Sequence, residues 1–115
     1  MNEKTGIVVE ESLIDSRILN DFRITKVRIS GHEAPEDRWH LYQVIATEQE
    51  IDRLSKNIKE SWYMHFWSGS QITAIFQNRI FEFDYEKKET WNDVIQYGLS
   101  RNIPIEQLDF PIEGL

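Results

Sequence analysis

An unbroken run of apolar and aromatic residues, WYMHFW at positions 62–67, constrains the fold of this chain more than any other feature. Successive side chains of a β-strand point to opposite faces of the sheet, so a strand with one wet face alternates apolar with polar residues. This run does not alternate. Both faces of the strand therefore have a use, one as the core and the other as a second aromatic surface.

The chain has 115 residues, which predicts a single domain over residues 1–115. An apolar content of 40% is ample for a globular fold, and the absence of cysteine excludes disulfides and thiolate chemistry. The sequence has no basic leader and no apolar stretch near the ~20 residues that span a bilayer. We therefore expect a cytoplasmic protein that does not bind membranes.

Local patterns predict the element order β-α-β-β-α-β-β-β-α. The predicted strands cover residues 5–10, 23–30, 39–47, 62–67, 71–77 and 79–85. Ser12 is expected to cap a short first helix, and Thr47 with Glu50 forms a capping box for a second helix that ends near residue 60. Thr90 is expected to cap the third helix, and Pro104 can open one last helical turn.

The first six elements have the β-α-β-β-α-β order of a ferredoxin-like unit, which a β-hairpin and a helix extend. We therefore predict an α+β fold. Its single sheet is mostly antiparallel, and its helices pack on one face.

The hairpin turns decide which side chains share a face, because directly opposite residues of antiparallel strands point the same way. A three-residue turn at SGS pairs Phe66 with Ile72, Met64 with Ala74 and Trp62 with Phe76, so every pair on one face of that hairpin is apolar. A two-residue turn that begins at Asn78 pairs Phe76 with Phe81. The predicted core face then consists of Trp62, Met64, Phe66, Ile72, Ala74, Phe76, Phe81, Phe83 and Tyr85.

These registers place polar-tipped aromatic side chains and carboxylates together on the opposite face. The predicted binding residues are Tyr63, His65, Trp67, Thr73, Glu82 and Asp84. Such a grouping is typical of binding surfaces rather than of solvated sheet faces. Three roles are open for it: packing beneath a loop or the C-terminal tail, an interface with a partner, or a small-molecule site.

No pattern predicts catalytic residues, a metal site or a cofactor. The three histidines share no i, i+4 spacing, and no glycine-rich phosphate loop is present. His65 beside Asp84 has no activated nucleophile nearby. An open aromatic sheet face also occurs in RNA-recognition domains, but the net charge of −7 disfavours nucleic acid as a partner.

The segments WYMHFW and YGLSRNIPIEQLDF resemble a small family of bacterial proteins of similar length to which no function is assigned. The resemblance covers the C-terminal half of the chain. It implies a bacterial cytoplasmic protein and brings no catalytic residue with it.

The sequence thus favours a non-catalytic interaction or binding protein that forms a homodimer through the aromatic sheet face. The alternative is a small-molecule binder or enzyme of the dimeric α+β barrel kind, with a pocket over Tyr63, His65 and Trp67. The two hypotheses differ in one observation. Either a ligand-sized cavity lies over these residues, or the face is flat and dry.

Overall fold

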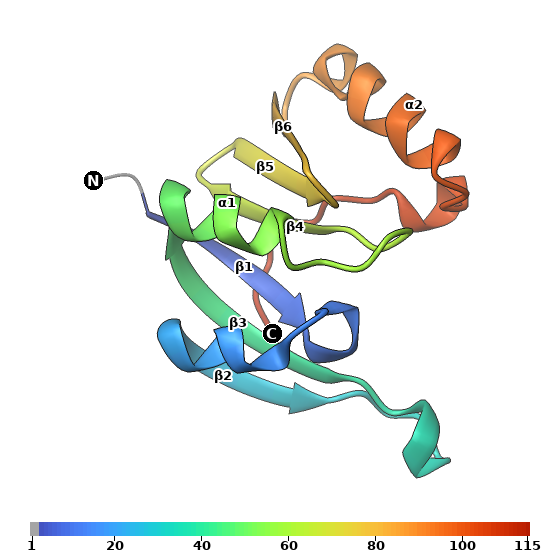
Figure 1. Cartoon of the computed structure of the whole chain (residues 1–115). Helices are drawn as coiled ribbons and strands as arrows, with labels where there is room; N and C mark the ends of the chain where they lie inside the picture. The colour runs from blue at the N-terminus through green and yellow to red at the C-terminus, as the bar shows by residue number, and fades with distance from the viewer. Residues whose placement is uncertain (1–2) are drawn as a thin grey trace.

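The computed structural model describes residues 3–115 and has a six-stranded antiparallel sheet with short helices (Figure 1). The strands are β1 (Glu3–Val9), β2 (Arg23–Ile29), β3 (His40–Thr47), β4 (Met64–Ser68), β5 (Gln71–Phe76) and β6 (Arg79–Asp84). They lie in the order β2-β3-β1-β4-β5-β6. The predicted α+β class and the antiparallel sheet are confirmed.

Short helices connect the strands. The α-helices are α1 (Glu48–Ser55) and α2 (Asn92–Ser100), and the 3-10 helices are η1 (Glu10–Ser12), η2 (Ser16–Asp21), η3 (Pro35–Asp37), η4 (Lys88–Trp91) and η5 (Ile105–Gln107). The predicted capping box of α1 is confirmed. The hydroxyl of Thr47 accepts from the backbone N–H of Glu50, whose carboxylate accepts from the backbone N–H of Thr47. As predicted, Pro104 precedes a last turn, η5.

The other two predicted caps are wrong. Ser12 ends η1, and its hydroxyl donates back to the carbonyl of Val9, whereas Asp15 caps η2 by accepting from the N–H of Arg17. Thr90 lies inside η4, and α2 begins without a side-chain cap. Both hydroxyls bond to backbone carbonyls that precede them, which is the local alternative to capping for such side chains.

The helices cover both faces of the sheet, not one as predicted. We term these sides the α1 face and the α2 face. The first core lies on the α1 face and consists of Val8, Leu13, Leu19, Phe22, Val44, Ala46, Ile51, Leu54, Ile58, Met64, Phe66 and Ile75. The second core lies on the α2 face and consists of Ile72, Ala74, Phe76, Phe83, Trp91, Val94, Ile103, Leu108 and Phe110.

Both predicted hairpin registers are wrong. Ser68 pairs with Gln71 and Phe76 pairs with Arg79, so each turn has two residues, Gly69-Ser70 and Gln77-Asn78. The φ angles of Gly69 (59°) and Asn78 (60°) lie in the left-handed region that tight hairpins use.

The new register of the first hairpin divides the predicted core face between the two cores. A shift of one residue moves a side chain to the other face of its neighbour strand. Phe66 therefore lies opposite Thr73 on the α1 face, whereas Ile72 lies on the α2 face opposite Trp67. The prediction placed helices against one face alone, but residues 72–76 are all buried, so both faces are dry there.

The C-terminal segment, residues 108–115, crosses the α2 face. In Figure 1 it is the red chain that passes behind the strands, on the side away from α1. The ring of Phe110 is 0% exposed and makes an edge-to-face contact with Phe83, with ring centroids 4.9 Å apart. The backbone N–H of Leu115 donates to the side-chain oxygen of Gln43 on β3 at 2.8 Å. The segment thus extends the second core from β6 across the sheet to β3.

Replacement of Phe110 by alanine tests whether this segment belongs to the core. We expect Phe110→Ala to lower the free energy of unfolding by about 3–5 kcal/mol, because it empties a fully buried ring site. Ile105, which is 54% exposed, gives the control: Ile105→Ala should change stability by less than about 0.5 kcal/mol. Urea denaturation measures both. A loss below about 1 kcal/mol for Phe110→Ala would place the segment outside the core.

Candidate functional site: the aromatic pocket

A pocket of about 440 Å³ opens on the α2 face. It lies where the C-terminal end of β1 meets the N-terminal end of β4, the loop before β4 and the chain around η5. Its lining is mostly apolar and aromatic and consists of Ile7, Val9, Trp39, Ser61, Trp62, Tyr63, Met64, His65, Ile103 and Gln107. Lysine, arginine, aspartate and glutamate are absent from this lining. We term it the aromatic pocket.

Strand alternation brings several of these side chains to the α2 face. On β1, Val8 is buried in the first core, so its neighbours Ile7 and Val9 point to the pocket side. Around the start of β4, Met64 belongs to the first core, so Tyr63 and His65 point the same way as the two β1 residues. The unbroken run therefore does serve two faces, as the sequence predicts.

Two tryptophans form one wall of the pocket. The rings of Trp39 and Trp62 meet edge to face, with centroids 5.4 Å apart and planes at 65°. Trp39 is 42% exposed, which is unusual for so large an apolar ring. Within residues 3–115 neither indole N–H donates to a protein acceptor. Both indoles therefore have a free donor beside an apolar surface.

The phenol of Tyr63 belongs to the opposite wall and is fixed by the chain around η5. Its hydroxyl donates to the backbone carbonyls of Gln107 and Asp109, and its ring stacks on Phe76 with centroids 5.6 Å apart. Burial raises the pKa of Tyr63 to about 12. The group is therefore a neutral phenol whose proton is held by the C-terminal segment.

His65 joins the pocket to the C-terminal segment. Its Nε2 lies 2.7 Å from the carbonyl oxygen of Pro111, which can only accept, so Nε2 carries the proton. Burial lowers the pKa of His65, and the bond to Pro111 and the charge of Asp109 oppose this only in part. The ring is therefore neutral near pH 7, and Nδ1 is a hydrogen-bond acceptor.

The structure separates the six predicted binding residues. Tyr63 and His65 line the aromatic pocket, and Trp67 packs against His65 with ring centroids 5.7 Å apart but does not line the pocket. Thr73 and Glu82 lie opposite each other on the α1 face, on the other side of the sheet. The cause is the register of the β4–β5 hairpin.

Asp84 also lies away from His65, so the base-and-carboxylate pair considered from the sequence is not formed. By strand alternation Asp84 shares the α1 face with Glu82, and its carboxylate accepts from the backbone N–H of Glu86. Thr73 is buried on that face and accepts a hydrogen bond from the ammonium of Lys4. Neither group takes part in the pocket.

Of the ten lining residues, sequence patterns predicted only Tyr63 and His65; the eight others are Ile7, Val9, Trp39, Ser61, Trp62, Met64, Ile103 and Gln107. Trp62 and Met64 were predicted on the core face, and both do contact the first core as well as the pocket. Most of the others come from segments that meet only in the folded chain, so no spacing announces them. Trp39 gave one local signal, because it opens a strand at the end of a polar loop.

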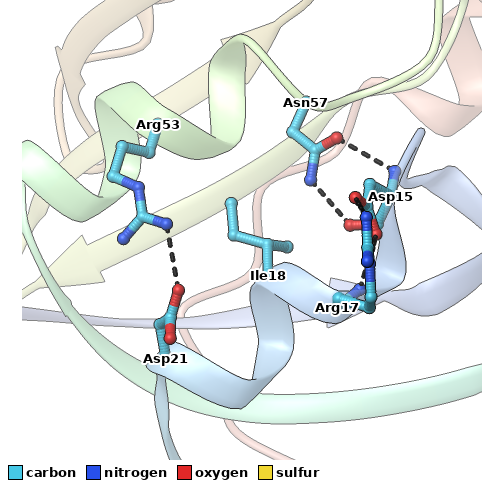
Figure 2. Close-up of a pocket in the computed structure, with 6 residues that line it drawn as sticks. All are labelled: Asp15, Arg17, Ile18, Asp21, Arg53 and Asn57. Atoms are coloured by element: carbon cyan, nitrogen blue, oxygen red, sulfur yellow. Dashed lines mark hydrogen bonds and ion pairs between the residues drawn. The ribbon is translucent and has the colours of Figure 1, made fainter.

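A second concavity, of about 420 Å³, lies between η2 and α1 (Figure 2). Its charges are paired: Arg17 binds the carboxylate of Asp15 at 2.7 Å, and Arg53 binds Asp21 at 3.1 Å. The side-chain amide of Asn57 bonds to both backbone groups of Asp15. Figure 2 shows Arg53 of α1 directed to Asp21 of η2, and Asn57 directed to Asp15. These bonds form a clamp that joins the segment of η2 to that of α1.

Within residues 3–115, no three histidine or acidic side chains come together in a way that could hold a metal ion. Over the same residues, no helix is long and apolar enough to cross a membrane.

Comparison with protein-family models, with curated proteins and with solved structures finds no match to this chain. The function is therefore argued from the site itself.

The neutral state of His65 predicts a pH dependence with a definite sign. Its folded pKa lies below the ordinary 6.5, so its contribution to stability is complete above pH 6.5 and is lost as the pH falls. We expect the free energy of unfolding of the wild type to fall relative to that of His65→Gln as the pH is lowered from about 7.5 to 5. Urea denaturation across this range measures it.

His40 provides a control of opposite sign. The hydrogen bond to the Glu11 carboxylate raises the pKa of His40, so its contribution is complete below pH 6.5 and is lost as the pH rises through the raised value. His40→Gln should therefore lower the free energy of unfolding most at low pH. Parallel pH profiles of the wild type and His65→Gln would contradict the burial of His65 as a neutral ring.

Proposed function

We propose that this protein is a non-catalytic binding protein that holds a small, uncharged and largely apolar molecule in the aromatic pocket. The observation that carries the proposal is the lining: two tryptophans, Tyr63 and aliphatic side chains, with no charged group. An apolar molecule gains free energy when it leaves water for such a surface. A charged molecule would lose its hydration there without a partner.

The size and shape of the pocket support a small molecule as the ligand. Sites for small molecules are concave, mostly apolar and about 300–1,000 Å³ in volume, with a few polar groups that fix orientation. The aromatic pocket has about 440 Å³. The lining residues with polar side-chain groups include Trp39, Trp62, His65 and Gln107. These groups favour a ligand that carries one hydroxyl or amide on an apolar body.

The state of the polar side chains supports binding rather than catalysis. Tyr63 has a pKa of about 12 and cannot act as a base near pH 7. His65 commits its Nε2 proton to Pro111, so that proton is not available to a substrate, and the hydroxyl of Ser61 donates to the carbonyl of Arg101 and not to His65. A nucleophile paired with a base is absent from the lining.

We infer further that β1 to β4, with η2 and α1, form a ferredoxin-like unit. The strand order β2-β3-β1-β4 supports it, and so does the burial of Leu19, near the end of η2, in one core with Ile51 of α1. The homodimer expected from the sequence stays a prediction. The C-terminal segment limits the surface available to it, because Phe110 and Pro111 contact His65 directly.

Pocket filling tests the proposal with the uncharged fluorescent probe N-phenyl-1-naphthylamine. We expect it to bind with increased emission, and Val9→Phe to weaken binding by at least about tenfold, because the new ring occupies the pocket. Val27→Phe is the matched control, since Val27 is exposed on β2 away from the pocket. It should leave binding unchanged.

A charged relative of the probe tests the selectivity. The sulfonate 8-anilino-1-naphthalenesulfonate has similar rings, and we expect it to bind at least about tenfold more weakly, because the lining offers no cation. Equal affinity of both valine variants for the uncharged probe, or no binding by the wild type, would rule out the aromatic pocket as a site for this class of ligand.

A further inference from the structure

Strand β2 is an open edge of the sheet. It stands first in the strand order and, among the strands of residues 3–115, pairs with β3 alone, so half of its backbone N–H and C=O groups point away from the sheet. The sequence predicts a half-buried strand here, but all seven residues of β2 are exposed. The alternating residues of this strand are therefore available to a partner on both faces.

The α1 face of β2 carries exposed apolar side chains. Ile24, Val27 and Ile29 are 39%, 59% and 47% exposed. They share the α1 face because a bulge between Ile24 and Lys26 shifts the register by one residue. Branched apolar side chains in a row on an exposed edge are a surface for pairing with another strand.

The α2 face of β2 carries three cations, Arg23, Lys26 and Arg28. Their partners across the ladder on β3 are Ile45, Gln43 and Leu41, none of which is acidic. Arg23 binds Glu3 at 3.1 Å, and Lys26 donates to a main-chain oxygen of Leu115. Within residues 3–115 no ion pair is formed by Arg28. In a protein with a net charge of −7, Arg28 thus leaves one positive charge without an ion-pair partner on this edge.

A second copy of the chain fits this edge poorly. Two β2 strands paired antiparallel would bring Lys26 and Arg28 of one copy beside the same residues of the other, and like charges across a ladder are destabilising. Lysine and a bulge are also common devices against such pairing. The positive charges do not repel a strand that brings carboxylates of its own, and the bulge lies before residues 26–29.

We propose that β2 is a docking edge for an extended acidic segment of another protein, which adds a seventh strand beside residues 26–29. Carboxylates of the segment lie opposite Lys26 and Arg28 on the α2 face, and its apolar side chains lie opposite Val27 and Ile29 on the α1 face. The partner sequence is thus an alternation of acidic and β-branched residues. Backbone hydrogen bonds supply affinity, and the alternation supplies specificity.

A blocked six-residue peptide of alternating glutamate and valine tests the proposal, with ¹⁵N-labelled protein observed by NMR. We expect the amide signals of residues 26–29 to shift on titration. A peptide of the same composition, with three glutamates followed by three valines, and an alternating lysine–valine peptide should each bind at least about tenfold more weakly. Absence of shifts in β2 at millimolar peptide would overturn the proposal.

Charge reversal at the edge gives the second test. The double variant Lys26→Glu/Arg28→Glu should weaken binding of the alternating glutamate–valine peptide by at least about tenfold. The control is Lys56→Glu/Lys87→Glu, which makes the same change in net charge at exposed lysines outside β2. An equal loss of peptide affinity in both double variants would show that net charge alone causes the effect, and it would overturn the proposed site on β2. Shifts of β2 that grow with protein concentration alone would identify a second copy as the occupant instead.

Discussion

Burial of β5 on both of its faces determines the rest of the structure. Since residues 72–76 are all buried, each face of the sheet centre needs its own cover. The α1 face receives α1 and η2, and the α2 face receives α2 and the C-terminal segment. The sequence of strand β1 fits this packing. Gly6 of β1 has no side chain because the ring of Phe66 fills its place, and an added Cβ would lie 2.1 Å from that ring.

Local patterns in the sequence predicted the element order, the α+β class and the capping box of α1, because each depends on residues close together in the chain. The registers were predicted wrongly because they depend on which faces are dry, and that is decided by α2 and by Phe110, both distant from the hairpins. One signal was available. The run ITAIF has no alternation, and such a run is typical of a strand buried on both faces.

The candidate site shows the same division. Tyr63 and His65 were predicted to share a surface because they are two residues apart on one strand, and that relation survives any register. The pairing of His65 with Asp84 did not survive, because it required a particular register on two hairpins. The tryptophan wall and Ile103 come from three separate segments. Only tertiary packing, which no local spacing encodes, brings them together.

The hydrogen bond between Leu115 and Gln43 joins residues 72 positions apart in the chain. Contacts of such long separation form only after a large loss of chain entropy, and folds that depend on them fold slowly. The β4–β5 and β5–β6 hairpins close much shorter loops, whereas the first core also needs distant contacts such as the pairing of Thr5 with Trp67. We therefore expect these hairpins to form early. The aromatic pocket, whose Tyr63 and His65 are held by the C-terminal segment, then acquires its final shape in the last step of folding.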